Sequence, residues 1–252
     1  MITDAADFAS IARELETAGD AEIARRVEED PRLSAAARAA REPLVARIDR
    51  DLGPFDPRHL RAIRDVPRER FVRPRDIARA CDDTPLALDD AALATISAPH
   101  AYLLSFRLLG LATGDACVEL GSGSGYGAAL AAFIVGPGGS VATFEIDEVL
   151  SRRATALLTR QARVRVFCMD AIASAPQWAP ALRVVATFAV RSLPRAWLDG
   201  LAEGGRLVAP VGPPDHDQRL VLAVRSEGRI ALSDHGAVRY VSDRGRGRRP
   251  TA

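Results

Sequence analysis

The segment that most constrains the fold is residues 118–127, which read VELGSGSGYG. An apolar run leads into Glu119, and glycines then recur at every second position, Gly121, Gly123 and Gly125. Glycine is needed where a chain turns sharply or where a ligand lies against bare backbone, and a helix that begins there offers free N–H groups. The segment therefore predicts a strand, a tight turn and a helix that together hold a nucleoside-containing cofactor.

The glycine spacing leaves the type of nucleoside open. Glu119 and the three glycines match in full the E-x-G-x-G-x-G pattern of S-adenosylmethionine sites. A dinucleotide fingerprint requires the frame Gly123, Gly125 and Ala128, which fits weakly. The next predicted strand ends in Glu145, where a carboxylate accepts hydrogen bonds from both ribose hydroxyls of either cofactor. A nicotinamide-dependent oxidoreductase therefore stays as an alternative.

Composition excludes several classes of partner. The net charge of +1 and a pI near 7.8 imply no nucleic acid or other polyanion. No apolar run approaches the roughly 18 residues of a membrane span, and the N-terminus does not resemble a signal peptide. The four histidines are scattered without the spacing of metal ligands, so no metal is expected. Three widely spaced cysteines fit free thiols of a soluble, cytoplasmic protein. The oligomeric state is left open.

Three regions are expected along the chain. Residues 1–52 are rich in Ala, Arg and Glu and predict a helical N-terminal extension, which is either a stabilising collar or a docking surface for a substrate or partner. Residues 53–242 form the main domain, and the Arg/Gly tail 243–252 is predicted to be disordered. The helices expected before residue 66 are 4–18, 21–29, one that runs from the N-cap Ser34 to Gly53, and one behind Asp56 and Pro57.

From residue 113 onward strands and helices alternate, which is typical of an α/β fold with a doubly wound, Rossmann-like parallel sheet. Two further strand-like runs joined through Glu227 and Gly228 predict an antiparallel hairpin that closes the sheet. The expected strands are 116–120, 140–144, 164–168, 184–188, 206–211, 220–225 and 229–232, and the expected helices are 126–133, 147–160 and 194–201.

In such a sheet a ligand lies beyond the carboxyl ends of the strands, where the strand order reverses. This rule gathers the glycine loop, Glu145 and Asp170 around one crevice. Asp170 follows the third strand and is suited to accept a hydrogen bond from an exocyclic adenine amine. It is equally suited to cap the helix that begins at Ala171, and the two roles are compatible.

Several motifs in order resemble the protein-L-isoaspartate O-methyltransferase family, over roughly residues 44–241. TISAPH at residues 95–100, at this distance before the glycine loop, resembles the active-site segment of that family and is far more specific than the loop. The other matching blocks are VPRERFV at 66–72, TPL at 84–86, VGPGGSV at 135–141, GGRLVAPVG at 204–212 and VRYV at 238–241.

The resemblance implies a class I methyltransferase that uses S-adenosylmethionine. It implies that Ser97 is the catalytic residue, because it lines the pocket where the substrate carboxylate meets the methyl group. From the residues alone, Ser97 is instead an N-cap before Pro99, and His100 has a supporting or packing role. The remaining implied assignments are Glu119, Gly121, Ser122, Gly123, Gly125, Glu145 and Asp170 for the cofactor, and Thr95, Ile96, His100, Phe188, Arg191 and Arg239 for the peptide or protein substrate.

The implied reaction requires little from side chains. A carboxylate is already an anion at pH 7 and needs no general base, so the site must hold oxygen, methyl carbon and sulfur in line. Such positioning is worth about 7–11 kcal/mol. The methyl ester is a good electrophile, and the neighbouring backbone amide closes on it to give a succinimide (aspartimide).

The chain departs from the family where a run of small residues is usual after the fourth strand. Phe188 and Arg191 stand there, Arg183 replaces an acidic residue, and the extension before Leu44 lies outside the common domain. Relatives with such changes methylate an Asp of a ribosomal precursor peptide, so these departures favour dedicated peptide tailoring over general isoaspartyl repair. A binding protein that kept the cofactor fold and lost catalysis is a further alternative.

Overall fold

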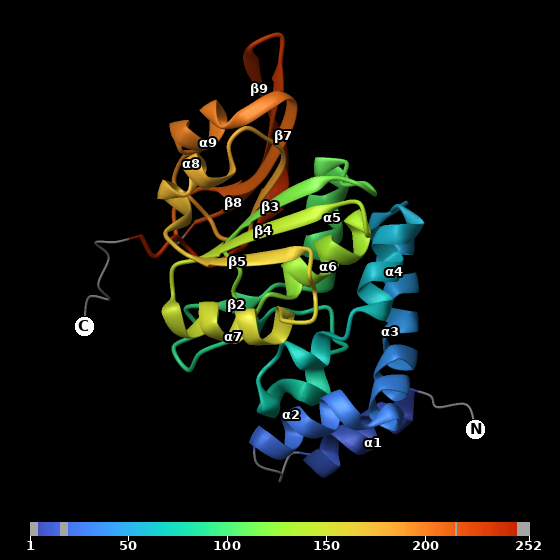
Figure 1. The fold of residues 1–252 in the computed structure, drawn as a ribbon. Helices are drawn as coiled ribbons and strands as arrows, with labels where there is room; N and C mark the ends of the chain where they lie inside the picture. Colours follow the sequence, from blue (N-terminus) through green and yellow to red (C-terminus); the bar gives the residue numbers. More distant parts are fainter. Residues whose placement is uncertain (1–4, 16–19, 215, 246–252) are drawn as a thin grey trace. The chain divides into compact units, whose positions relative to one another are not determined.

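The computed structural model describes residues 5–15, 20–214 and 216–245, and the chain divides into two compact units, residues 1–103 and 104–252 (Figure 1). The N-terminal helices therefore share a unit with residues 53–103. The boundary expected at residue 52 stays a prediction about domains. The tail predicted to be disordered lies, from residue 246 on, outside the described residues.

The first unit is built around a long helix, α3 (Pro31–Leu52). The prediction that this helix begins behind Ser34 is wrong, because Asp30 is the N-cap and accepts hydrogen bonds from the backbone N–H groups of Arg32 and Leu33. Pro31 follows at the first helical position, where its missing N–H costs nothing. The other elements are α1 (Ala5–Leu15), α2 (Asp20–Glu29), α4 (Pro57–Asp65), η1 (Arg68–Arg70), η2 (Pro74–Arg79), β1 (Leu86–Ala87) and β2 (Thr95–Ile96).

A buried ion pair joins α3 to η1. The Arg41 guanidinium lies 2.5 Å from a carboxylate oxygen of Glu69, and both residues are at least 96% buried. Arg41 also donates through Nε to the Arg64 carbonyl at 2.8 Å. Burial raises the pKa of Glu69, and the neighbouring Arg41 charge opposes that shift. The extension thus supplies core contacts of this unit, and its role as a collar or as a docking surface stays a prediction.

The second unit contains, within its described residues, a seven-stranded sheet in the order β5-β4-β3-β6-β7-β8-β9. The first five strands in that order run parallel, and β8 and β9 are antiparallel. The chain leaves β3 toward β4 and β5 and then returns to β6, so the strand order reverses between β3 and β6. The strands are β3 (Ala116–Leu120), β4 (Ser140–Glu145), β5 (Val164–Cys168), β6 (Ala181–Ala186), β7 (Leu201–Val211), β8 (Gln218–Ser226) and β9 (Arg229–Val238).

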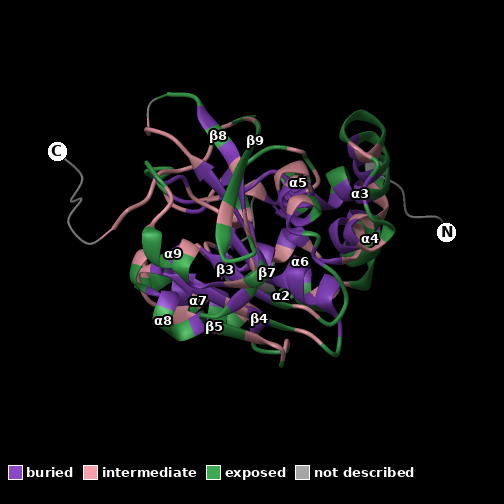
Figure 2. Cartoon of the chain, turned by 90° about the horizontal axis from the view of Figure 1, so that it is seen from above, coloured by how far each residue is buried: buried purple, intermediate pink, exposed green. Residues whose placement is uncertain are grey.

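Helices cover both faces of this sheet, as predicted for a doubly wound fold. In Figure 1, α6 (Tyr126–Val135) and α7 (Glu148–Leu158) lie on one side of β3, β4 and β5, whereas α8 (Ala175–Trp178) and α9 (Arg195–Asp199) lie on the other. Trp178 and Trp197, from α8 and α9, pack in one hydrophobic cluster with the central strands. Figure 2 shows the contrast between the buried central strands and the exposed outer strand β9.

The expected strands and helices of this unit are all present, but several have other bounds; the strand expected over 229–232, for example, continues to Val238. Strand β6 ends at Ala186, so Phe188 lies beyond the strand in the following loop. The helix expected over 194–201 ends at Asp199, and β7 begins at Leu201. The hairpin through Glu227 and Gly228 forms as predicted, and both residues have positive φ. A remaining helix, α5 (Pro99–Leu109), begins in the first unit and ends in the second.

Candidate cofactor and acceptor site

The glycine loop turns tightly around the end of β4. The backbone N–H groups of Gly121 and Ser122 donate to the Phe144 carbonyl at 2.8 and 3.0 Å. Gly121, Gly123 and Gly125 all have positive φ, at 97, 52 and 88°. A Cβ at Gly121 would meet the Thr187 hydroxyl at 2.5 Å and the Phe188 ring at 2.8 Å. Only glycine fits here, so the spacing seen in the sequence has a steric cause.

A series of hydrogen bonds between buried polar side chains supports the loop. The Thr143 hydroxyl donates to the Glu119 carboxylate at 2.6 Å and shares a second 2.6 Å hydrogen bond with the Ser122 hydroxyl. Glu119 is only 2% exposed. Burial raises its pKa to about 8, the nearby Glu145 carboxylate adds to that shift, and the Thr143 hydrogen bond opposes it. The structure therefore gives Glu119 a partner in β4, Thr143, which in turn contacts Ser122 of the loop. The contact of Glu119 with a cofactor stays a prediction.

Glu145, at the end of β4, faces the loop. One carboxylate oxygen accepts from the Gly123 N–H at 2.7 Å, and the other accepts from the Asp147 N–H at 3.0 Å. Burial raises the pKa of Glu145, and these two hydrogen bonds act against the shift. The structure thus brings the predicted ribose acceptor to the middle glycine of the loop.

Asp170 has the capping role that the sequence allowed. Its Oδ1 accepts from the Ile172 N–H at 2.9 Å, at the start of a short 3-10 helix, η3 (Ala171–Ala173). Asp170 follows β5, and Glu145 follows the neighbouring strand β4, so both lie at the carboxyl end of the sheet. The predicted adenine contact is compatible with this geometry, because the second carboxylate oxygen is not used by the cap.

The C-terminal segment runs along the same edge of the sheet. Ala189, after β6, donates to the Val241 carbonyl at 2.8 Å and accepts from the Asp243 N–H at 2.9 Å. Farther along, the Arg244 guanidinium lies 3.6 Å from the Asp147 carboxylate, next to Glu145. This segment therefore connects the end of β6 with the start of α7, and sequence reasoning missed it. The available signal was Arg244, one of four arginines in a tail expected to be disordered.

Phe188, Arg191 and Arg239 also lie at this edge. The Phe188 ring packs against Gly121 and meets the Trp197 ring edge-to-face, with centroids 6.0 Å apart. Arg191 is exposed in the loop after β6, and Arg239 directly follows β9, whose end pairs with the start of β8.

The other predicted residues form a group of their own in the first unit. Thr95 and Ile96 make up β2, which pairs with β1, and Ile96 is fully buried. Helix α5 begins at Pro99, so Ala98 and not Ser97 directly precedes it, and the prediction from the residues alone that Ser97 is the N-cap is wrong. The Ser97 carbonyl accepts a hydrogen bond from the Arg68 guanidinium at 3.1 Å.

Arg68 is a residue that sequence reasoning passed over. It is 1% exposed, and besides Ser97 its guanidinium donates to the carbonyls of Ala80, Asp82 and Thr84 at 2.7–3.2 Å. One side chain therefore connects residues 80–84, which end at the first residue of TPL, to the TISAPH segment. Its place inside the VPRERFV motif was the available signal.

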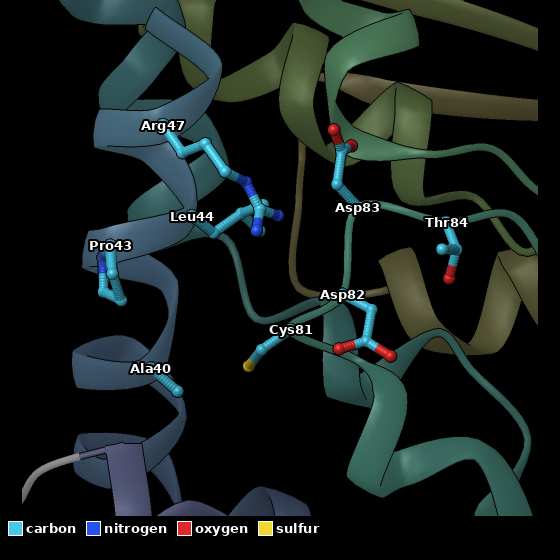
Figure 3. A pocket seen from close by; sticks show the side chains of 8 residues that line it. All are labelled: Ala40, Pro43, Leu44, Arg47, Cys81, Asp82, Asp83 and Thr84. Atoms are coloured by element: carbon cyan, nitrogen blue, oxygen red, sulfur yellow. The ribbon is translucent and has the colours of Figure 1, made fainter. Parts of the chain in front are cut away.

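His100 has a defined partner, Asp83. One Asp83 oxygen lies 3.0 Å from the His100 backbone N–H and 2.9 Å from its Nδ1. Burial alone would raise the pKa of Asp83, but the hydrogen bonds from His100 lower it below its usual range. Asp83 also lines a cavity of about 370 Å³ between α3 and residues 81–84, into which Arg47 extends (Figure 3). The supporting role allowed for His100 agrees with this pairing.

Comparison with known proteins decides the family. The model of the family "Protein-L-isoaspartate(D-aspartate) O-methyltransferase (PCMT)" matches residues 43–247. A protein-L-isoaspartate O-methyltransferase of Methanospirillum hungatei is 38% identical over 192 residues, which are 75% of this chain and 86% of the relative. One from Archaeoglobus fulgidus is 36% identical over 208 residues, 81% of this chain and 93% of the relative. The chain belongs to this family.

A solved structure agrees in fold. The putative protein-L-isoaspartate O-methyltransferase of Plasmodium falciparum, in complex with S-adenosyl-L-homocysteine, superposes with a TM-score of 0.69 at 23% identity, covering 82% of this chain and 97% of that one. As a family member, the protein is a carboxyl methyltransferase whose methyl donor is S-adenosylmethionine.

The residues present fit that donor. The loop presents bare backbone, because a Cβ at Gly121 would collide with Thr187 and Phe188. The Glu145 carboxylate, which can accept hydrogen bonds from ribose hydroxyls, lies beside Gly123. The donor supplies an activated methyl group, so the protein itself must only bind, orient and exclude water. No group of His, Cys, Asp and Glu suited to hold a metal ion occurs among the described residues, and none of the described helices is long and apolar enough to cross a membrane.

Proposed function

We propose that the protein transfers a methyl group from S-adenosylmethionine to the carboxylate of an aspartyl or isoaspartyl residue in a peptide or protein. The ester then loses methanol as the neighbouring amide closes to a succinimide. The family match and the loop held against Glu145 carry this proposal. In it, Gly121, Ser122 and Gly123 contact the methionine part of the donor, Glu145 the ribose and Asp170 the adenine.

The acceptor side is assigned to the TISAPH segment. Ser97 is the catalytic residue that meets the substrate carboxylate, with Thr95, Ile96 and His100 beside it. Because Ile96 is buried, its contribution is through the backbone. Arg68 is a positioning residue for this segment, since its four carbonyl partners include that of Ser97.

Dedicated modification of a precursor peptide is favoured over general repair. Phe188 packs directly on Gly121, so a bulky ring occupies the edge of the sheet where a varied protein substrate would have to approach the methyl group. The exposed cation of Arg191 three residues later adds a chemical preference. General isoaspartyl repair is the second candidate, and the names of the relatives support it.

Mass spectrometry with labelled S-adenosylmethionine tests both candidates. Repair predicts labelling of arbitrary isoaspartyl peptides, whereas tailoring predicts labelling of an Asp only in a partner peptide encoded near this gene. In either case the gain of one methyl group is followed by loss of methanol. If neither peptide class is labelled while S-adenosylhomocysteine still binds, a binding protein without catalysis is the correct description.

We further propose a cytoplasmic location. Cys81, Cys117 and Cys168 are free thiols, which suits a reducing compartment. Fractionation of the native host with an antibody against the chain tests this, and recovery outside the cytoplasm contradicts it.

A further inference from the structure

A cavity of about 210 Å³ lies at the carboxyl end of the sheet, beside the proposed donor site. Two of its lining residues are close neighbours of that site: Ile172 follows the Asp170 cap, and Ala189 follows Phe188. Arg191, Ser192 and Asp243 supply polar groups to its wall. The cavity therefore lies next to the proposed donor site, but none of its lining residues is one of the proposed donor-binding residues.

The backbone beneath Arg191 is held from both sides. Val190 donates to the Pro210 carbonyl at 3.0 Å and accepts from the Gly212 N–H at 2.9 Å. Ala189 is paired in the same way with the C-terminal segment, at Val241 and Asp243. Because the backbone next to Arg191 is already ordered by these hydrogen bonds, binding of a ligand by the Arg191 guanidinium costs little backbone entropy.

Arg191 and Asp243 do not neutralise each other by direct contact. No ion pair or hydrogen bond to the Arg191 side chain occurs among the described residues, and Asp243 uses one oxygen to accept from the Gly245 N–H at 2.8 Å. The cavity wall thus offers two separate polar groups, the Arg191 guanidinium and one oxygen of the Asp243 carboxylate. An acidic residue of a peptide matches both, since its side chain suits the guanidinium and its backbone N–H suits Asp243.

We propose that this cavity binds an acidic residue of the substrate peptide that flanks the methylated Asp or isoaspartate, with Arg191 as the specificity-determining residue. The proposal rests on the proposed function and refines its substrate class. Binding the flank rather than the acceptor is the chemically consistent choice, because an ion pair with the acceptor carboxylate would withdraw charge from the attacking oxygen.

The test compares peptides that differ only at one flanking position. Binding to the enzyme loaded with S-adenosylhomocysteine, and kcat/KM for methylation, are measured for peptides with Glu, Gln or Lys beside a fixed acceptor, over each flanking position in turn. The wild type is expected to prefer Glu over Gln about 10- to 100-fold at one position. Arg191→Gln removes the preference, and Arg191→Glu shifts it toward Lys.

Arg195→Gln is the matched control, because Arg195 is an exposed arginine four residues away that pairs with Asp199. It is expected to leave the preference unchanged. Equal binding of the Glu and Gln peptides by the wild type, or a preference that persists in Arg191→Gln, overturns the proposal. A Glu preference in binding without methylation of any peptide supports the cavity and rejects the proposed function instead.

Discussion

Two parts of the predicted site are fixed by different kinds of contact. The glycine loop is held by the strands that flank it, through main-chain hydrogen bonds to Phe144 and a buried chain of small polar groups. Residues 80–84 and Ser97 are held instead by one long side chain, Arg68, which reaches four carbonyls. The proposed donor half is therefore held by the sheet, whereas the proposed acceptor half is held by side-chain contacts, of Arg68 and of the Asp83–His100 pair, together with the short pairing of β1 and β2.

Replacing Arg68 should produce the largest effect. Arg68→Met leaves four carbonyls without their donor, and each buried unsatisfied group costs about 1–3 kcal/mol. We expect methyl transfer to be lost and the first unit to unfold at lower denaturant concentration, while the affinity for S-adenosylhomocysteine changes little. Calorimetric titration and unfolding followed by circular dichroism measure these outcomes. Parallel loss of donor binding would show that the two halves are not independent.

Gly121→Ala tests the opposite half. The new side chain meets Thr187 and Phe188 in a backbone conformation that disfavours any Cβ, so we expect S-adenosylhomocysteine to bind about 100-fold more weakly. Gly114→Ala is the matched control, since Gly114 has a similar φ of 89° but nothing within 4 Å of the added Cβ. If both variants lose the same affinity, backbone strain and not the collision is responsible.

Glu145→Gln should have a smaller effect on donor binding. The amide keeps an acceptor for the Gly123 N–H, but loses the charge that strengthens hydrogen bonds to ribose hydroxyls. We expect about a 10-fold rise in the dissociation constant of S-adenosylhomocysteine, with unchanged peptide affinity. An unchanged dissociation constant would remove Glu145 from the donor site.

Glu119→Gln should alter the pH dependence of stability more than donor binding. The native pKa of about 8 lies above the ordinary value of 4.5, so the folded state binds the proton more tightly than the unfolded state. Its contribution to stability is complete below pH 4.5 and is lost as the pH rises toward 8, by about 1.4 kcal/mol per pH unit within that window. Urea unfolding at several pH values should show a flatter profile for the variant, and an unchanged profile contradicts the assignment.

The sequence by itself determined the glycine loop and the strand pattern. The residues from Glu119 to Gly125, and Glu145 beyond them, were recognisable because a turn against bare backbone admits only glycine and because parallel strands place their ends at one edge. Those constraints are local, so they leave a spacing that can be read along the chain. The Asp170 cap and the Glu227–Gly228 turn were predicted for the same reason.

Only the tertiary structure decided how the other residues meet. Arg68 and Ser97 are 29 residues apart, Arg41 and Glu69 are 28 apart, and the Ala189 loop pairs with the C-terminal segment. The periodicity of the sequence does not predict such pairs, because the partners of a long side chain depend on how elements distant in the sequence pack together. The helix start at Pro31 was missed for another reason. Asp30 and Ser34 are both good N-cap residues, so the residue type alone does not choose between them, and the helix begins behind Asp30.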